Sequence, residues 1–306
     1  MKSVDALLNG LVDYAGLFPP ASQDMREALE SYASYTKGSD RAALARFIVP
    51  LARLEQLEEA ATDLLPRRTS SSPWRLSVIV AEDVRAAGEE MLRFNGRHSA
   101  GSDAGHAVID VAELKASTAD EIDHQRQDLP EFFTAYFEIP TAGDVTPLVR
   151  AIARARSRAK VRTGGVTPQA FPAAQRVIDF IAACEREAVP FKATAGLHHA
   201  VRGDYRLTYE PESPVGTMYG FLNVFIAAAL LHAGAGENTA LAALEEVDAG
   251  AFIFEEDAIV WKGNRVSAQQ IASSRNQLAI SFGSCSFREP VDELARLASM
   301  TTSVTA

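Results

Sequence analysis

The feature that most constrains the fold is a regular alternation of short apolar runs with longer segments of helical periodicity. Eight runs are predicted as strands, at residues 16–19, 47–50, 76–80, 106–111, 135–139, 159–162, 190–194 and 278–282. Each is followed by a predicted helix, at residues 25–37, 54–65, 83–94, 119–127, 145–158, 168–188, 218–232 and 290–298. Because strands alternating with helices form a parallel sheet, eight such units predict an α/β protein with a (β/α)8 TIM barrel.

The same pattern predicts the domain organisation. An open Rossmann-type sheet is disfavoured, because no Gly-x-Gly-x-x-Gly follows the first strand. We therefore expect residues 1–306 to form one barrel domain. Residues 234–277 interrupt the alternation and predict a β-hairpin with flanking helices, inserted between helix seven and strand eight. Residues 202–216 predict a long loop after strand seven, on the face where barrel active sites lie.

Composition excludes several classes of protein. The net charge of −10 disfavours nonspecific binding to nucleic acid, which needs a concentrated basic surface. Two cysteines, Cys184 and Cys285, are too few for a disulfide scaffold or a cysteine-based zinc site, and the longest apolar run, 220–231, is too short to cross a bilayer. We expect a cytoplasmic protein without nucleic-acid or membrane partners. The apolar helix at 218–232 and the hairpin are candidate contacts for a homo-oligomer.

Charged residues inside the predicted strands point to a site. Alternation along a strand places Lys160 and Arg162 on one face of strand six, and Lys192 and Thr194 on one face of strand seven. Two carboxylates, Asp110 and Glu138, also have apolar neighbours. Buried charges are costly unless they are paired, so a cluster at strand ends favours a catalytic site. The alternative is that Glu138 with Arg162, and Asp110 with Lys160, form ion pairs that fill the barrel.

These residue types predict a particular chemistry. A lysine that is partly desolvated and close to other cations has more of its amine neutral, and a neutral amine can attack a carbonyl to form a Schiff base. Lys192 and Arg162 would place Lys160 in such surroundings. Asp110 or Glu138 would then transfer protons while a carbon–carbon bond is formed or broken.

Three motifs carry a resemblance to a known family. Residues 160–165 (KVRTGG) are similar to the strand-six Schiff-base segment of deoxyribose-phosphate aldolases, which are class I aldolases on a (β/α)8 barrel. Residues 191–197 (FKATAGL) resemble the lysine-containing strand seven of that family, and residues 280–287 (ISFGSCSF) resemble its phosphate-binding turn. The resemblance implies a Schiff base at Lys160, with Lys192 as the second lysine and Asp110 as the proton relay.

The chain also departs from that family. Arg162 replaces a small hydroxyl residue, His198 and His199 stand where the family has an Arg-Thr pair, and the insertion at 234–277 is foreign to it. The substrate should therefore differ. We expect a lyase that acts on a small phosphorylated or carboxylated carbonyl compound.

Small residues at the ends of strands six to eight predict an anion site. Their backbone N–H groups can bind a phosphate or a carboxylate, and the side chain of Arg162 suits either anion. The alternative is that the glycines only allow tight turns between strand and helix. The residues expected to contact the substrate are Arg162, Thr163, Gly164, Gly165, Thr194, Gly196, His198, His199, Gly283 and Ser284.

The adjacent histidines leave two further functions open. His198 or His199 with strand-end carboxylates would suit a metal-dependent hydrolase or lyase. However, Lys160 and Arg162 would repel a cation, and neighbours in an extended segment point in opposite directions. We therefore expect no metal and no cofactor, with one histidine contacting substrate or acting as acid or base. The other alternative is a barrel that only binds an anionic metabolite.

Overall fold

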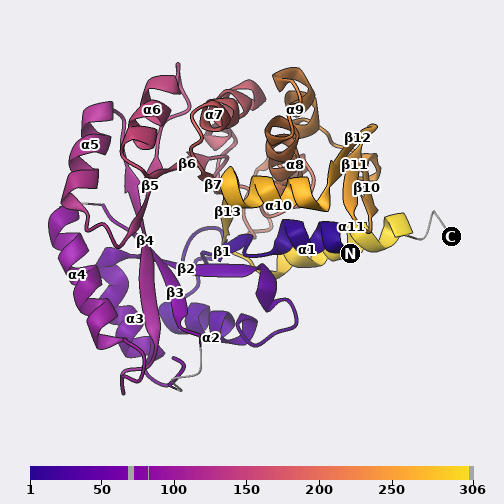
Figure 1. Cartoon of the computed structure of the whole chain (residues 1–306). Coiled ribbons are helices and arrows are strands. Elements are labelled where there is room, and N and C mark those ends of the chain that lie inside the picture. Colours follow the sequence, from indigo (N-terminus) through magenta and orange to yellow (C-terminus); the bar gives the residue numbers. More distant parts are fainter. Residues whose placement is uncertain (68–71, 82, 303–306) are drawn as a thin grey trace.

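The structure is a computed structural model that describes residues 1–67, 72–81 and 83–302. Its centre is a closed barrel of parallel strands in the order β1-β13-β7-β6-β5-β4-β3-β2 (Figure 1). This confirms the predicted (β/α)8 TIM barrel. The barrel strands are β1 (Val12–Tyr14), β2 (Leu44–Pro50), β3 (Trp74–Ile79), β4 (Ala107–Lys115), β5 (Thr134–Glu138), β6 (Arg158–Arg162), β7 (Phe191–Thr194) and β13 (Ala279–Ser284).

Helices surround the barrel, one after each strand, and a further helix, α1 (Lys2–Leu8), precedes β1. Local signals set several of their ends. Thr118 and Glu121 form a capping box at the start of α5, and Pro147 stands in the first turn of α6, where its missing N–H costs no hydrogen bond. The ring consists of α2 (Met25–Tyr35), α3 (Leu54–Ala61), α4 (Val84–Arg97), α5 (Ala119–Asp128), α6 (Thr146–Arg154), α7 (Ala174–Arg186), α8 (Phe221–His232) and α11 (Arg288–Thr302).

The first strand was predicted at the wrong residues. Residues 16–19 form a turn, and the strand lies earlier, at Val12–Tyr14. Pro19 and Pro20 have no N–H to donate to a neighbouring strand, whereas Val12 and Tyr14 pair with both β13 and β2. The other seven predicted strands overlap observed ones. β4 continues to Lys115, beyond its predicted end at residue 111.

The insertion at 234–277 has the two flanking helices that were predicted, but a three-stranded sheet stands in place of the hairpin. It contains α9 (Glu237–Leu244), a three-stranded antiparallel sheet and α10 (Ala268–Gln277), and Figure 1 shows the small sheet at the side of the barrel. The loop predicted at 202–216 also contains a hairpin. These additional strands are β10 (Phe252–Glu255), β11 (Ala258–Trp261) and β12 (Asn264–Ser267) in the insertion, and β8 (Gly203–Arg206) and β9 (Val215–Met218) in the hairpin.

Helix α8 does not offer the apolar surface expected for a subunit contact. Its residues 221–231 are all buried inside the chain, where they pack against α7, α9, α10 and β13. Its one polar residue in that run, Asn223, donates to the carbonyls of Ala243 and Glu246 at the end of α9 and accepts from the N–H of Arg202. The apolar composition of α8 therefore serves folding within one chain.

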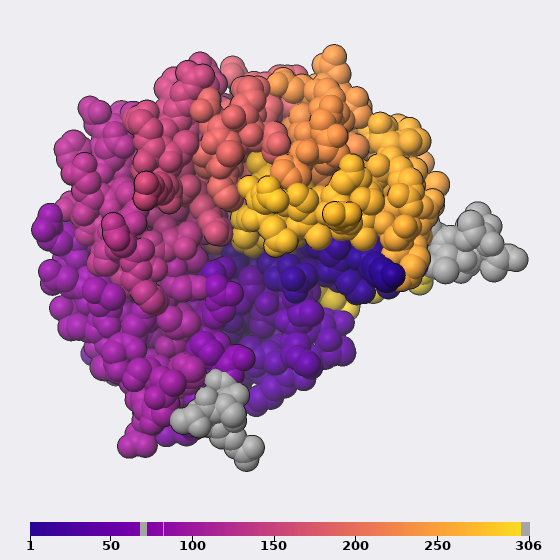
Figure 2. All heavy atoms as spheres, viewed as in Figure 1, coloured from indigo at the N-terminus to yellow at the C-terminus, as the bar shows by residue number. Residues whose placement is uncertain are grey.

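The first and last strands of the barrel pair with each other and close it. β1 pairs with β13, and in Figure 2 the N-terminal residues (indigo) and C-terminal residues (yellow) lie side by side.

Within the residues that the structure describes, no helix combines the length and apolar character needed to cross a membrane.

Candidate active site

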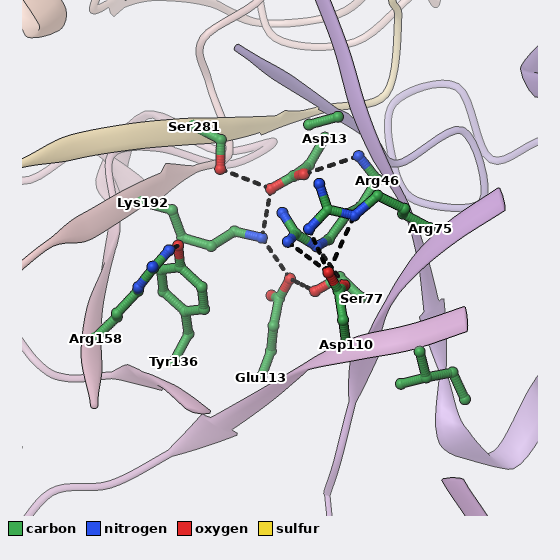
Figure 3. Close-up of polar contacts among 12 residues, drawn as sticks. Asp13, Arg46, Arg75, Ser77, Asp110, Glu113, Tyr136, Arg158, Lys192 and Ser281 are labelled. Atoms are coloured by element: carbon green, nitrogen blue, oxygen red, sulfur yellow. Dashed lines mark hydrogen bonds and ion pairs between the residues drawn. The ribbon is translucent and has the colours of Figure 1, made fainter. Parts of the chain in front are cut away.

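The middle of the barrel is occupied by a buried ion network centred on Lys192. Its amine lies 2.7 Å from Asp13 Oδ2 and 2.6 Å from Glu113 Oε1, and all three side chains are buried (Figure 3). Ser281 donates to Asp13 at 2.8 Å, and Ser77 donates to Glu113 at 2.6 Å. These contacts satisfy the charges that the barrel interior removes from water.

Lys160 joins the same network from the neighbouring strand. Its amine lies 2.8 Å from Glu113 Oε2 and 2.7 Å from Glu138 Oε2. Glu138 in turn faces Arg162, whose Nε lies 3.4 Å from Oε1. Two lysines therefore contact opposite oxygens of one carboxylate. The charges alternate in the order Asp13, Lys192, Glu113, Lys160, Glu138 and Arg162.

The network favours the charged forms of Glu113, Glu138 and Lys192. Burial alone would raise the pKa of Glu113, but Lys160 and Lys192 outweigh burial and bring that pKa far below its usual range. Burial alone would lower the pKa of Lys192, but Asp13 and Glu113 raise it well above its usual value. For Glu138, burial is likewise outweighed, mainly by Lys160, and the pKa is lowered. Lys192 is thus a fixed cation beside Glu113.

A cavity of about 280 Å³ opens above this network at the carboxyl ends of the strands. Lys160 and Glu113 reach its lining, whereas Lys192 and Asp13 lie beneath it. Most of the wall is apolar. The lining residues include Ala15, Phe18, Pro19, Pro20, Ile48, Ile79, Val166 and Ala195, together with the polar or small residues Arg162, Gly165, Thr194, Gly196, His198, Gly283 and Cys285.

Asp110 lies away from this cavity, nearer the start of β4. Its carboxylate pairs with Arg46, with Nε 2.6 Å from Oδ1, and with Arg75, whose Nε lies 3.0 Å from Oδ2 (Figure 3). The ion pair expected between Asp110 and Lys160 is not formed, and Glu113 takes that position. The expected pair of Glu138 with Arg162 is present.

A register irregularity explains how Glu113 reaches the interior. Leu76 of β3 pairs with Ile109, but Ser77 pairs with Val111, so Asp110 is an extra residue in β4. Such a bulge reverses the alternation beyond it, and both carboxylates, three residues apart, then face the barrel interior. Strict alternation would place Glu113 on the helix side.

The predicted glycine-rich turns divide into two groups. Gly165, Gly196, Gly283 and Thr194 line the cavity. The remaining residues have internal roles: Thr163 donates to the carbonyl of Ala195 at 2.7 Å, Gly164 packs against Phe171, and Ser284 Oγ accepts from the N–H of Ser286 at 3.3 Å.

The two histidines point in different directions. His198 lines the cavity, with Nδ1 3.6 Å from Cys285 Sγ and 3.7 Å from Glu289 Oε2. Burial, together with the neighbouring His199, lowers the pKa of His198 to about 4, so its imidazole is neutral at pH 7. His199 instead lies 2.7 Å from Glu293 Oε1 and stacks on the ring of Tyr205. Over the described part of the chain, no group of three or more His, Cys, Asp or Glu side chains could hold a metal ion.

Two residues of the network, Asp13 and Glu113, are absent from the residues predicted from sequence. Each is a charged residue with apolar neighbours on both sides, which is the same signal that identifies Glu138 and Lys192. They were missed because the first strand was placed too late and the fourth was ended too early.

Comparisons of this chain with protein-family models, with curated proteins and with solved structures find no match. The closed parallel barrel is that of a TIM-type fold, and no relative supports the aldolase grouping. The chemistry of the site therefore has to follow from its own side chains.

We predict that Gly196→Ala destabilises the turn that borders the cavity. Gly196 has a φ of 72°, and a Cβ there would lie 2.7 Å from Phe171 Cε1 and 3.0 Å from Gly164 Cα. A left-handed conformation costs a non-glycine residue roughly 1–2 kcal/mol. Urea unfolding should show a loss of at least that size. The control Gly96→Ala, in helix α4 with open space around it, should instead gain ~0.5–1 kcal/mol. Equal stability of Gly196→Ala and the wild type would contradict the described turn.

Proposed function

We propose that the protein is a class I aldolase-like lyase, in which Lys160 forms a Schiff base with a small carbonyl compound carrying a phosphate or a carboxylate. One observation carries this proposal. The amine of Lys160 lies in the lining of a mostly apolar cavity, within 2.8 Å of two carboxylates, Glu113 and Glu138. A nucleophile with adjacent proton acceptors at the carboxyl end of a barrel is the arrangement that this chemistry needs.

The reaction begins with a proton transfer from the Lys160 ammonium to Glu138, which lies 2.7 Å away. The neutral amine attacks the carbonyl carbon, and the carbonyl oxygen takes up protons and leaves as water, giving an iminium. A base then removes the proton of the β-hydroxyl, and the Cα–Cβ bond breaks so that Cβ leaves as the carbonyl carbon of the first product. The electron pair of that bond forms the enamine double bond, and the C=N π pair moves to the iminium nitrogen. Protonation of the resulting enamine at Cα and addition of water release the product and restore Lys160.

Lys192 supports this sequence without touching the substrate. It is buried beneath the cavity and remains a cation, so its charge stays beside Glu113 whichever protonation state Lys160 adopts. Moving a proton from Lys160 to a carboxylate leaves the total charge of the network unchanged. The step therefore requires no new uncompensated charge in the barrel interior.

The apolar wall supports the dehydration step. Side chains such as Phe18, Ile48 and Ile79 border the space above Lys160 and limit the access of water to an iminium formed there. His198, neutral and in the same lining, is placed to exchange a proton with a substrate hydroxyl.

The two other functions that the sequence left open have less support in the geometry. A metal site would need His198 or His199 to meet the strand-end carboxylates, but His198 lies beside Glu289 and His199 pairs with Glu293, both in α11. A barrel that only binds an anionic metabolite would not need a lysine amine between two carboxylates in its cavity lining.

Reductive trapping tests the proposal. The protein is incubated with acetaldehyde, pyruvate or glycolaldehyde phosphate, treated with sodium borohydride, and analysed by intact mass and peptide mapping. We expect one stable secondary amine, at Lys160, and none at Lys192, because Lys192 is buried below the cavity. No adduct with any of the three compounds, or adducts only on exposed lysines, would rule the proposal out.

We further predict that Glu138→Gln slows this chemistry by about 10²–10⁴-fold, the usual contribution of a positioned acid or base. Glutamine keeps the shape of Glu138 but cannot accept the proton of Lys160. The measurement is the rate of borohydride-trapped adduct formation on folded protein. Asp110→Asn is the comparison variant and should keep the wild-type rate, since Asp110 lies outside the cavity. The opposite ranking of these variants would assign the proton relay to Asp110.

A further inference from the structure

A second cavity, of about 410 Å³, lies at the carboxyl ends of β4, β5 and β6. Arg162 lines both this cavity and the one that contains Lys160, so the two spaces meet at its side chain. The polar residues that line the second cavity are Lys115, Ser117, Glu138, Thr141, Arg162 and Gln169.

The charge of this second cavity is positive. The Arg162 side chain is 49% exposed, and only its Nε faces Glu138. Neither the terminal nitrogens of Arg162 nor the amine of Lys115 make a hydrogen bond or ion pair with any described residue. Glu138 also lines the cavity, and its carboxylate faces Lys160 at 2.7 Å and the Nε of Arg162 at 3.4 Å. The terminal nitrogens of Arg162 and the amine of Lys115 are thus left to bind an incoming anion.

The part of the barrel mouth beside β7 and β13 has carboxyl groups instead. Glu293 accepts the N–H of Ala200 at 2.7 Å and pairs with His199, and Glu289 accepts from Tyr209 at 3.0 Å. These two residues follow β13 and border the turns after β7 and β13. An anionic group there would meet a negative field, whereas one near Lys115 and Arg162 would be attracted.

We propose that the second cavity is the subsite for the phosphate or carboxylate of the substrate, held between Arg162 and Lys115. This inference rests on the proposed function, because it places the reacting carbonyl at Lys160 in the first cavity. Arg162 binds the anion with its planar pair of terminal nitrogens, and Lys115 supplies a second charge. Ser117, Thr141 and Gln169 are available to hydrogen-bond hydroxyl groups. The substrate class is therefore a short hydroxylated carbonyl compound with a terminal oxyanion.

Direct binding of simple anions tests the subsite without any reaction. Titration calorimetry or NMR with inorganic phosphate and, separately, with malonate measures the affinity of the wild type and of three variants. We expect at least one anion to bind, Lys115→Met to bind it about tenfold more weakly, and Lys115→Arg to stay close to the wild type. Lys37→Met, which removes an exposed charge outside both cavities, should not alter the affinity.

The two anions distinguish a phosphate substrate from a carboxylate substrate. The subsite proposal would be overturned if neither anion binds. It would also be overturned if Lys115→Met binds as tightly as the wild type, or if Lys115→Met and Lys37→Met lose the same amount of affinity. A failure of the subsite proposal can be distinguished from a failure of the proposed lyase reaction. Anion binding that depends on Lys115, without any adduct at Lys160, would support the subsite and overturn only the Schiff-base chemistry.

Discussion

Replacing Lys160 with methionine is expected to abolish the borohydride-trapped adduct and to lower turnover by about 10³-fold or more, because the nucleophile itself is removed. Methionine has a length similar to that of lysine but no amine. The fold should persist, since Glu113 keeps its contact with Lys192 and Glu138 keeps its contact with Arg162. Mass spectrometry of the reduced protein gives the adduct yield, and circular dichroism verifies the fold.

Lys160→Arg is the matched control for charge. A guanidinium preserves a cation between Glu113 and Glu138 but does not form a Schiff base under these conditions. Both variants should therefore lose the adduct, although only Lys160→Met loses the charge. A variant that lacks Lys160 and still forms the adduct at the wild-type yield would show that another lysine reacts.

Lys192→Met is expected to destabilise the protein by about 3–5 kcal/mol, the usual cost of removing one partner from a buried ion pair. Asp13 loses the cation that lies 2.7 Å away, and Glu113 loses one of its two. Urea unfolding followed by fluorescence measures the change in the free energy of unfolding. Arg85→Met is the control, because Arg85 pairs with Asp128 at the surface and such pairs contribute only ~0–1 kcal/mol. If Lys192→Met lowered the free energy of unfolding by less than ~1 kcal/mol, as for a surface pair, the described network would be contradicted.

The pKa shifts fix the pH window in which this network contributes stability. The pKa of Glu113 is lowered from 4.5, so its contribution is complete above that value and is lost as the pH falls toward the folded-state pKa. The pKa of Lys192 is raised from 10.5, so its contribution is complete below that value and is lost as the pH rises toward its folded-state pKa. The difference in unfolding free energy between wild type and Lys192→Met should therefore be largest between these two limits.

Much of this site follows from local sequence patterns. Apolar and polar alternation along β6 and β7 places Lys160, Arg162, Lys192 and Thr194 on inward faces, because side chains alternate with a period of two residues. The eightfold repetition of strand and helix in the sequence is enough to predict the barrel. The first strand is the exception: β1 is short and includes inward-facing Asp13, so apolar periodicity favoured the turn beside it.

The partners of the charges depend on contacts between distant strands. Asp110 and Glu113 both lie in β4, but the bulge at its pairing with β3 decides that Glu113 meets the lysines and Asp110 meets Arg46. Strand register is set by neighbours dozens of residues away in the chain, and a shift of one residue exchanges the two faces of a strand. Local periodicity therefore identified a charged interior, while the closed barrel determined which carboxylate faces Lys160 and which lies outside the cavity.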